Sequence, residues 1–196
     1  MQMVVYGISV LDAIISASVI YTLPFMELQP IYTCTSAESP EPYECKAKDF
    51  CAKTEVTPTI DWSHDNSLHN WNEHLDMTCS NETSVGMIAS LYFIGFVSTI
   101  GIAGRLSDTV GRRKVILLGM FIQTVCCFAF LFMDSLSQAK VFIFCYGLGT
   151  GLVFGLDMFM QEFMIVSQRA ALQTYLQAVD GLTMVIFIFY CLYITK

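Results

Sequence analysis

The chain has 196 residues, of which 55% are hydrophobic and only 14% are charged, and its formal net charge is −7. A soluble domain needs a largely polar surface, so this composition excludes one and indicates a membrane protein. Apolar stretches close to the ~20 residues that a helix needs to cross a bilayer cover 4–26, 84–103, 115–133, 141–160 and 171–194. The predicted fold class is therefore all-α, a polytopic membrane protein with five transmembrane helices.

The first apolar stretch is predicted to stay in the membrane and not to be removed as a signal peptide. It has no basic segment before it, and it is longer than the roughly 7 to 15 apolar residues of a signal peptide. The expected organisation is a first helix within 1–28, a large outer loop over 29–83, and helices 2 to 5 of the same membrane domain over 84–196.

Charge predicts the orientation of these helices. The loop between the first two helices holds ten acidic residues against three lysines, whereas the 104–115 connection holds four basic residues, Arg105, Arg112, Arg113 and Lys114. The positive-inside rule places that basic connection in the cytoplasm and the acidic loop outside. On the simplest interpretation, the four cations only fix the topology.

The 104–113 segment also has an ordered pattern, G-x-L-x-D-x-x-G-R-R, formed by Gly104, Leu106, Asp108, Gly111, Arg112 and Arg113. Glycines allow a tight turn between two helices, and Asp108 is expected to cap a helix end and engage the neighbouring arginines. The pattern resembles the loop signature between helices 2 and 3 of the major facilitator superfamily. The resemblance implies a gating loop that latches the cytoplasmic ends of two transporter halves.

Two further segments are similar to the organic cation and organic anion transporter family within that superfamily. A large cysteine-containing outer loop ends in WNEHLDMTCS, in which Trp71, Leu75, Asp76 and Cys79 match the family pattern. The fourth apolar stretch holds YGLGTGLVFG and is followed by Glu162 and Arg169, which the resemblance implies are cytoplasmic charge partners. The chain thus resembles the N-terminal half of such a transporter, helices 1 to 5 only.

Glycines at 147, 151 and 155 form two overlapping G-x-x-x-G repeats, with Gly149 between them. Small residues at this spacing allow a neighbouring helix to approach closely. Helix packing is therefore favoured over substrate contact for these positions.

The eight cysteines divide by compartment. Cys34, Cys45, Cys51 and Cys79 lie in the outer loop, and the others lie in predicted helices. In an oxidising compartment the four loop cysteines predict two disulfides with three possible pairings. Zinc is the rival interpretation because three histidines lie nearby, but no common zinc spacing is present, so no metal site and no cofactor are expected.

Three acidic residues fall inside predicted spans, namely Asp12, Asp157 and Asp180. An isolated carboxylate in hydrocarbon costs about 2.5 to 3.5 kcal/mol or more, so each should face a wet cavity, share a proton or bind a cation. Asp12 and Asp180 lie at similar depth, counted from the cytoplasmic side. These acids are candidate substrate or proton groups, and they favour an organic cation over an anion. The alternatives are that Asp157 is solvated near a helix end and that Asp180 accompanies a helix irregularity at Gly181.

Two functions remain open from the sequence. The first is organic-ion transport by alternating access, for which the chain supplies only part of a twelve-helix transporter. The second is a non-transporting accessory subunit of a larger membrane complex.

An enzyme is not expected because no nucleophile and base pair is apparent, and nucleic acid is not an expected partner. The expected partners are lipid, a second transporter half or other membrane subunits, and a small organic ion. The expected location is the plasma membrane, with an organelle membrane such as the mitochondrial inner membrane as the alternative.

Overall fold

The computed structural model describes residues 2–36, 39–51, 56–64, 67–155 and 165–194. Five of its helices are long and apolar enough to cross a membrane, which confirms the predicted class. They are α1 (Gln2–Met26), α4 (Glu82–Val110), α5 (Arg112–Phe130), α6 (Leu136–Val153) and α8 (Val166–Tyr193). The chain divides into two compact units, 1–20 with 86–185 and 21–85 with 186–196.

Several helix boundaries differ from those expected from hydropathy, and two of them have a clear physical reason. The helix α4 continues past Ala103 to Val110, because a helix needs no apolar side chains where it leaves the hydrocarbon. The helix α6 begins at Leu136 because Ser135 caps it, accepting a hydrogen bond from the Gln138 backbone N–H. Residues 156–160 of the fourth predicted span lie outside the described residues.

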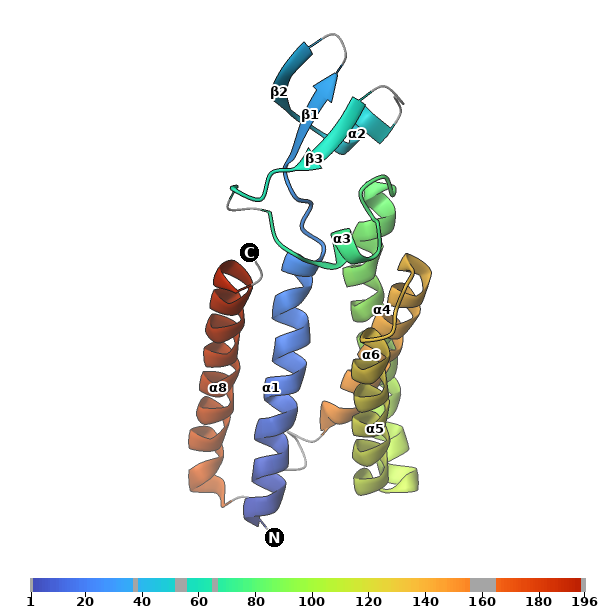
Figure 1. Cartoon of the computed structure of the whole chain (residues 1–196). Helices are drawn as coiled ribbons and strands as arrows, with labels where there is room; N and C mark the ends of the chain where they lie inside the picture. The colour runs from blue at the N-terminus through green and yellow to red at the C-terminus, as the bar shows by residue number, and fades with distance from the viewer. Residues whose placement is uncertain (1, 37–38, 52–55, 65–66, 156–164, 195–196) are drawn as a thin grey trace. The chain divides into compact units, whose positions relative to one another are not determined.

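Glycines bring α6 into close contact with α4 and α5 (Figure 1). A Cβ atom at Gly147 or Gly151 would meet the backbone of α4 at the carbonyls of Tyr92 and Phe96. Gly149 lies on another side of the helix, where a Cβ would come within 3.0 Å of the Gly119 carbonyl in α5. The close packing predicted for the glycine repeat is therefore confirmed at Gly147 and Gly151. It is not seen at Gly155, where a Cβ would meet no atom of the described residues within 4 Å.

The segment after α1 folds into a small structure that the sequence did not reveal, here called the disulfide module (residues 29–81). It contains β1 (Tyr32–Ser36), β2 (Ser39–Cys45), α2 (Ala47–Cys51), β3 (Val56–Ile60) and α3 (Trp71–His74). The antiparallel sheet has the strand order β2-β1-β3, with Tyr32 opposite both Cys45 and Ile60.

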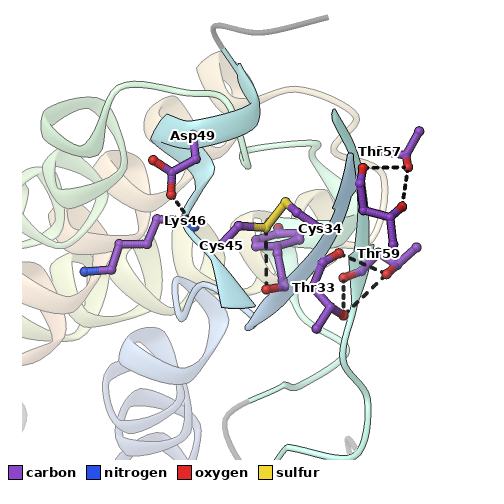
Figure 2. Close-up of a disulfide and its surroundings, with 9 residues drawn as sticks. Thr33, Cys34, Cys45, Lys46, Asp49, Thr57 and Thr59 are labelled. Carbon is purple, nitrogen blue, oxygen red and sulfur yellow. Dashed lines mark hydrogen bonds between the residues drawn. A yellow bond between two sulfur atoms is a disulfide. The ribbon is translucent and has the colours of Figure 1, made fainter. Parts of the chain in front are cut away.

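The two faces of β1 differ sharply, as Figure 2 shows around Cys34. Tyr32 and Cys34 are buried and pack with Cys45 and Phe50, whereas Thr33 is half-buried and Thr35 is exposed. The Thr33 and Thr35 hydroxyls form hydrogen-bonding pairs with those of Thr59 and Thr57 on β3, at 3.4 and 2.8 Å. Cross-strand threonine pairs of this kind stabilise the sheet.

Two disulfides close the module, and they select one of the three pairings left open by the sequence. Cys34 is bonded to Cys45 across the sheet, with their Cα atoms 5.8 Å apart. Cys51 at the end of α2 is bonded to Cys79, which lies just before α4. A module this small buries little apolar surface, so such cross-links carry much of its stability.

Asn70 fixes the module to the end of α1. Its side-chain nitrogen donates to the backbone carbonyls of Phe25 and Leu28 at 2.9 and 2.7 Å, and its oxygen accepts from the Asn72 N–H. The Asn72 side chain is also buried, yet neither its nitrogen nor its oxygen has a hydrogen-bond partner among the described residues. The two neighbouring asparagines therefore have opposite energetic roles.

We expect Asn70→Leu to lower the midpoint of thermal unfolding by several degrees, because it removes the side-chain donor that the Phe25 and Leu28 carbonyls share, at about 1 to 3 kcal/mol. The matched variant Asn72→Leu removes only unsatisfied atoms and should be neutral or stabilising. Thermal unfolding of both variants in detergent tests this difference. Equal destabilisation by the two substitutions would contradict it.

For the glycine contact, Gly147→Ala should destabilise the protein because its methyl group would overlap the Tyr92 carbonyl, at an overpacking cost of about 1 to 3 kcal/mol. Gly7→Ala in α1 is the control, since a Cβ there meets no atom within 4 Å. The same unfolding measurement should separate the two alanine variants, and indistinguishable midpoints would rule out tight packing at Gly147.

Candidate functional site

A buried glutamine joins three of the membrane helices. Gln123 of α5 is only 3% exposed, and its amide nitrogen donates to the Ser16 hydroxyl of α1 at 3.2 Å and to the Thr150 hydroxyl of α6 at 3.1 Å. Thr150 in turn donates to the Tyr146 carbonyl one turn earlier. Because hydrocarbon offers no water, such bonds between helices are the available way to satisfy these polar groups.

Two tyrosines extend this network toward α1 and α4. The Tyr146 hydroxyl of α6 donates to the Ile15 carbonyl of α1 at 3.4 Å. Tyr92 of α4 shares a hydrogen bond with Thr150, and its ring lies 6.2 Å from that of Tyr146. We call the interacting set the Gln123 cluster, comprising Ser16, Tyr92, Gln123, Tyr146 and Thr150.

Asp12 lies beside the Gln123 cluster. It precedes Ser16 by four residues, so both side chains lie on one face of α1. Its charge acts on the hydroxyls of both Tyr92 and Tyr146, and its side chain is only half-buried. The Tyr92 and Tyr146 rings are buried, at 3% and 0% exposed, so the partly accessible carboxylate of Asp12 is the group here whose chemistry suits an organic cation.

Asp180 is half-buried at a depth comparable with that of Asp12. The helices α1 and α8 run in the same direction (Figure 1), and the rings of Tyr6 and Tyr175 on them lie 5.8 Å apart. Each acid follows its tyrosine in the sequence by about 7 to 9 Å of helix. At ~100° per residue, however, each acid lies about 120° to 140° around its helix from that contact. Asp12 is thus oriented toward the Gln123 cluster, and the shared depth does not make Asp180 part of it. Asp157 lies outside the described residues.

Comparison with known proteins identifies the family of this bundle. The model of the Major Facilitator Superfamily matches residues 5–194. The chain belongs to the major facilitator superfamily.

Individual superfamily relatives match shorter segments. An organic cation/carnitine transporter 2 from Rattus norvegicus is 32% identical over 74 residues, which cover 38% of the chain and 13% of the relative. An uncharacterized transporter from Rickettsia felis is 36% identical over 69 residues, or 34% of the chain and 17% of the relative. The chloramphenicol resistance protein CraA from Acinetobacter baumannii is 33% identical over 64 residues, or 33% of the chain and 16% of the relative. The matches thus span only about a sixth of the length of these proteins.

The superfamily loop signature forms a sharp corner between α4 and α5. Gly111 alone separates the two helices, and its φ of 101° is a conformation that favours glycine. Gly104 instead lies within α4, where it makes no turn. Asp108 lies in the last turn of α4 and caps no helix, since Gly111 is the N-cap of α5 and no side-chain hydrogen bond caps that helix. The capping predicted for Asp108 and the turn predicted at Gly104 are therefore wrong.

The remaining charges of the signature lie at the start of α5. Arg113 is exposed and Arg112 is half-buried. Arg169, one of the two expected charge partners, lies in the first turn of α8, and the other, Glu162, lies outside the described residues. An acidic residue in the last turn of α4 and basic residues in the first turn of α5 oppose their own helix dipoles, so local helix stability does not account for them.

Gln123 is a polar residue in the third apolar stretch of the sequence, but no sequence pattern identifies its partners. Ser16 and Thr150 are small hydroxyl residues, which are common within membrane helices and carry no distinctive spacing. The sequence predicts only that a lone glutamine in the third apolar stretch needs polar partners on neighbouring helices.

A double-mutant cycle between Gln123→Leu and Ser16→Ala should show a coupling free energy of about 0.5 to 1.7 kcal/mol, the range measured for hydrogen bonds between membrane helices. The cycle Gln123→Leu with Ser18→Ala is the control, because the Ser18 hydroxyl donates within α1 to Ile15. Additive effects in the Ser16 cycle would show that this bond does not join α1 to α5.

At the corner, Gly111→Ala should cost about 1 to 3 kcal/mol of stability, because a side chain strains this backbone conformation. Gly104→Ala, in the middle of a helical segment and with space around it, should be neutral or slightly stabilising. Unfolding midpoints of the two variants test the assignment, which fails if Gly111→Ala is tolerated as well as Gly104→Ala.

Proposed function

We propose that this chain forms part of an alternating-access transporter for organic ions, with cations favoured. The observation that carries the proposal is the placement of Asp12 beside Tyr92 and Tyr146. A half-buried carboxylate within a span supplies the negative charge that attracts a cation. The Arg and Lys residues of the described membrane helices, by contrast, lie close to the helix ends, so they offer little to an anion within the bilayer.

One relative supports this substrate class, because an organic cation/carnitine transporter matches part of the chain. Asp180 and Asp157 are secondary candidates for proton or substrate binding, because a carboxylate within a span requires a proton, a cation or water.

Alternating access in this superfamily uses two six-helix halves that rock about a central site. The proposal therefore includes a second half that supplies the opposite wall of the site. Within this mechanism, we assign the latch to Gly104, Asp108, Gly111, Arg112 and Arg113, with Glu162 and Arg169 as its charge partners. The charges that oppose the dipoles of α4 and α5 support this assignment, because they gain favourable partners only outside their own helices.

We place the protein in the plasma membrane, with the disulfide module outside the cell. Disulfides form and persist in oxidising compartments, and the module is acidic while the Gly111 corner is basic. An organelle membrane facing an oxidising compartment fits the same features, and location by fluorescence microscopy separates the two.

The transport proposal predicts that Asp12→Asn reduces uptake of tetraethylammonium at least tenfold while leaving the amount of protein in the membrane unchanged. Asp134→Asn is the control, because Asp134 is exposed between α5 and α6. Uptake is measured in cells that express the protein together with its second half. Full uptake by Asp12→Asn, or transport of p-aminohippurate in preference to the cation, would contradict the proposed role of Asp12.

The composition of the native particle separates transport from the accessory-subunit alternative. Gentle detergent extraction followed by native mass spectrometry should recover the chain together with a second six-helix half. Recovery as a stoichiometric member of a large complex that lacks such a half would favour a scaffold and reject transport.

A further inference from the structure

Three side chains of the disulfide module form a stack on its surface. The imidazole of His69 lies on the indole of Trp62, with ring centroids 4.0 Å apart and an angle of 26° between the rings. The His69 Nδ1 atom lies 2.8 Å from a carboxylate oxygen of Glu73, one helical turn later. Both charged partners remain open to water, with the His69 and Glu73 side chains 56% and 43% exposed.

This stack adjoins the attachment of the module to α1. Asn70, the next residue after His69, donates to the Phe25 and Leu28 carbonyls at the end of α1. Ser67, two residues before His69, is fully buried and its hydroxyl accepts from the Ile31 N–H. Side chains on both sides of His69 are therefore hydrogen-bonded to the segment that leaves α1.

The charged state of His69 determines how strongly the stack holds. A protonated imidazole forms an ion pair with Glu73 and places a cation over the face of Trp62, and both attractions weaken when the proton leaves. Histidine changes charge between about pH 5 and 8, where carboxylates remain ionised. The stack therefore strengthens as the solution becomes acidic.

Among the described residues, the other titratable groups of this region include Glu27, Asp61, His64, His74, Asp76 and Tyr32. Hydrogen bonds from the Ser63 side chain and backbone hold the pKa of Asp61 below its ordinary value, so Asp61 stays ionised across this interval. Burial raises the pKa of Tyr32, which stays neutral. Glu73 is the carboxylate paired with the His69 ring, and His64 and His74 are the other described histidines of the module.

We propose that Trp62, His69 and Glu73 form a pH-sensitive clasp that tightens the attachment of the disulfide module to the end of α1 in acidic surroundings. The clasp is a property of the module and does not depend on transport. If the chain transports solutes, the clasp gives it a means to respond to the pH outside the membrane.

Tryptophan fluorescence of the chain in lipid nanodiscs tests the clasp. The chain has two tryptophans, so Trp71→Phe leaves Trp62 as its single fluorophore. We expect Trp62 emission to fall about twofold between pH 8 and 5, because a protonated imidazole in contact with indole quenches it. His69→Gln should abolish the transition, and Glu73→Gln should move it to lower pH because the imidazolium loses its carboxylate partner.

His74→Gln is the control, since it removes an exposed histidine of α3 and should leave the transition unchanged. Emission that does not change with pH, or a transition that survives His69→Gln, would overturn the clasp.

Hydrogen exchange of residues 25–31, corrected for the intrinsic effect of pH, tests whether the clasp tightens the attachment to α1. Protection should be about threefold higher at pH 5.5 than at 7.5 and should be insensitive to pH in His69→Gln. Equal protection in the native chain would overturn the coupling.

Discussion

Hydrocarbon cannot satisfy a polar side chain, and this constraint determines how the membrane helices associate. The Gln123 amide satisfies it by bonding to hydroxyls on α1 and α6. Those bonds require helices that lie close together, and the glycines at 119, 147, 149 and 151 provide that proximity by removing Cβ atoms from the contacts with α6. Close packing and the polar network are therefore mutually dependent, and together they hold Tyr92 and Tyr146 near Asp12.

The stability of the disulfide module has a different limit, because the module is exposed to water and has too few residues for a large core. Covalent links compensate, one across the sheet and one to the residues just before α4. The edge strands also carry prolines, Pro40 and Pro42 on β2 and Pro58 on β3. Proline donates no ladder hydrogen bond, so these edges resist pairing with other chains.

Much of the architecture followed from the sequence because each membrane span must be long, apolar and helical. The superfamily was also recognisable from the sequence, since all the residues of its G-x-L-x-D-x-x-G-R-R signature lie close together in one short segment, 104–113. The sheet was not found, although YTCTS alternates buried and exposed residues, because its short strands lie among cysteines and prolines that are equally typical of loops. Asp108 was misassigned because its loop position was inferred from hydropathy, whereas the helix α4 continues through it. The partners of Gln123 depend on helix rotation, which no single-sequence pattern specifies.

The central claim is that Asp12 faces a wet path within the membrane, and cysteine accessibility tests it most directly. A single cysteine at position 12 or at the exposed position Phe121 of α5 would be introduced after Cys126, Cys127, Cys145 and Cys191 are replaced by alanine. In native membranes that also contain the second half, the cysteine at 12 should react with a charged, membrane-impermeant thiol reagent, and a cysteine at lipid-facing 121 should not. An unreactive cysteine at 12 from both sides of the membrane would show that Asp12 is sealed within protein or lipid, and it would contradict the transport account.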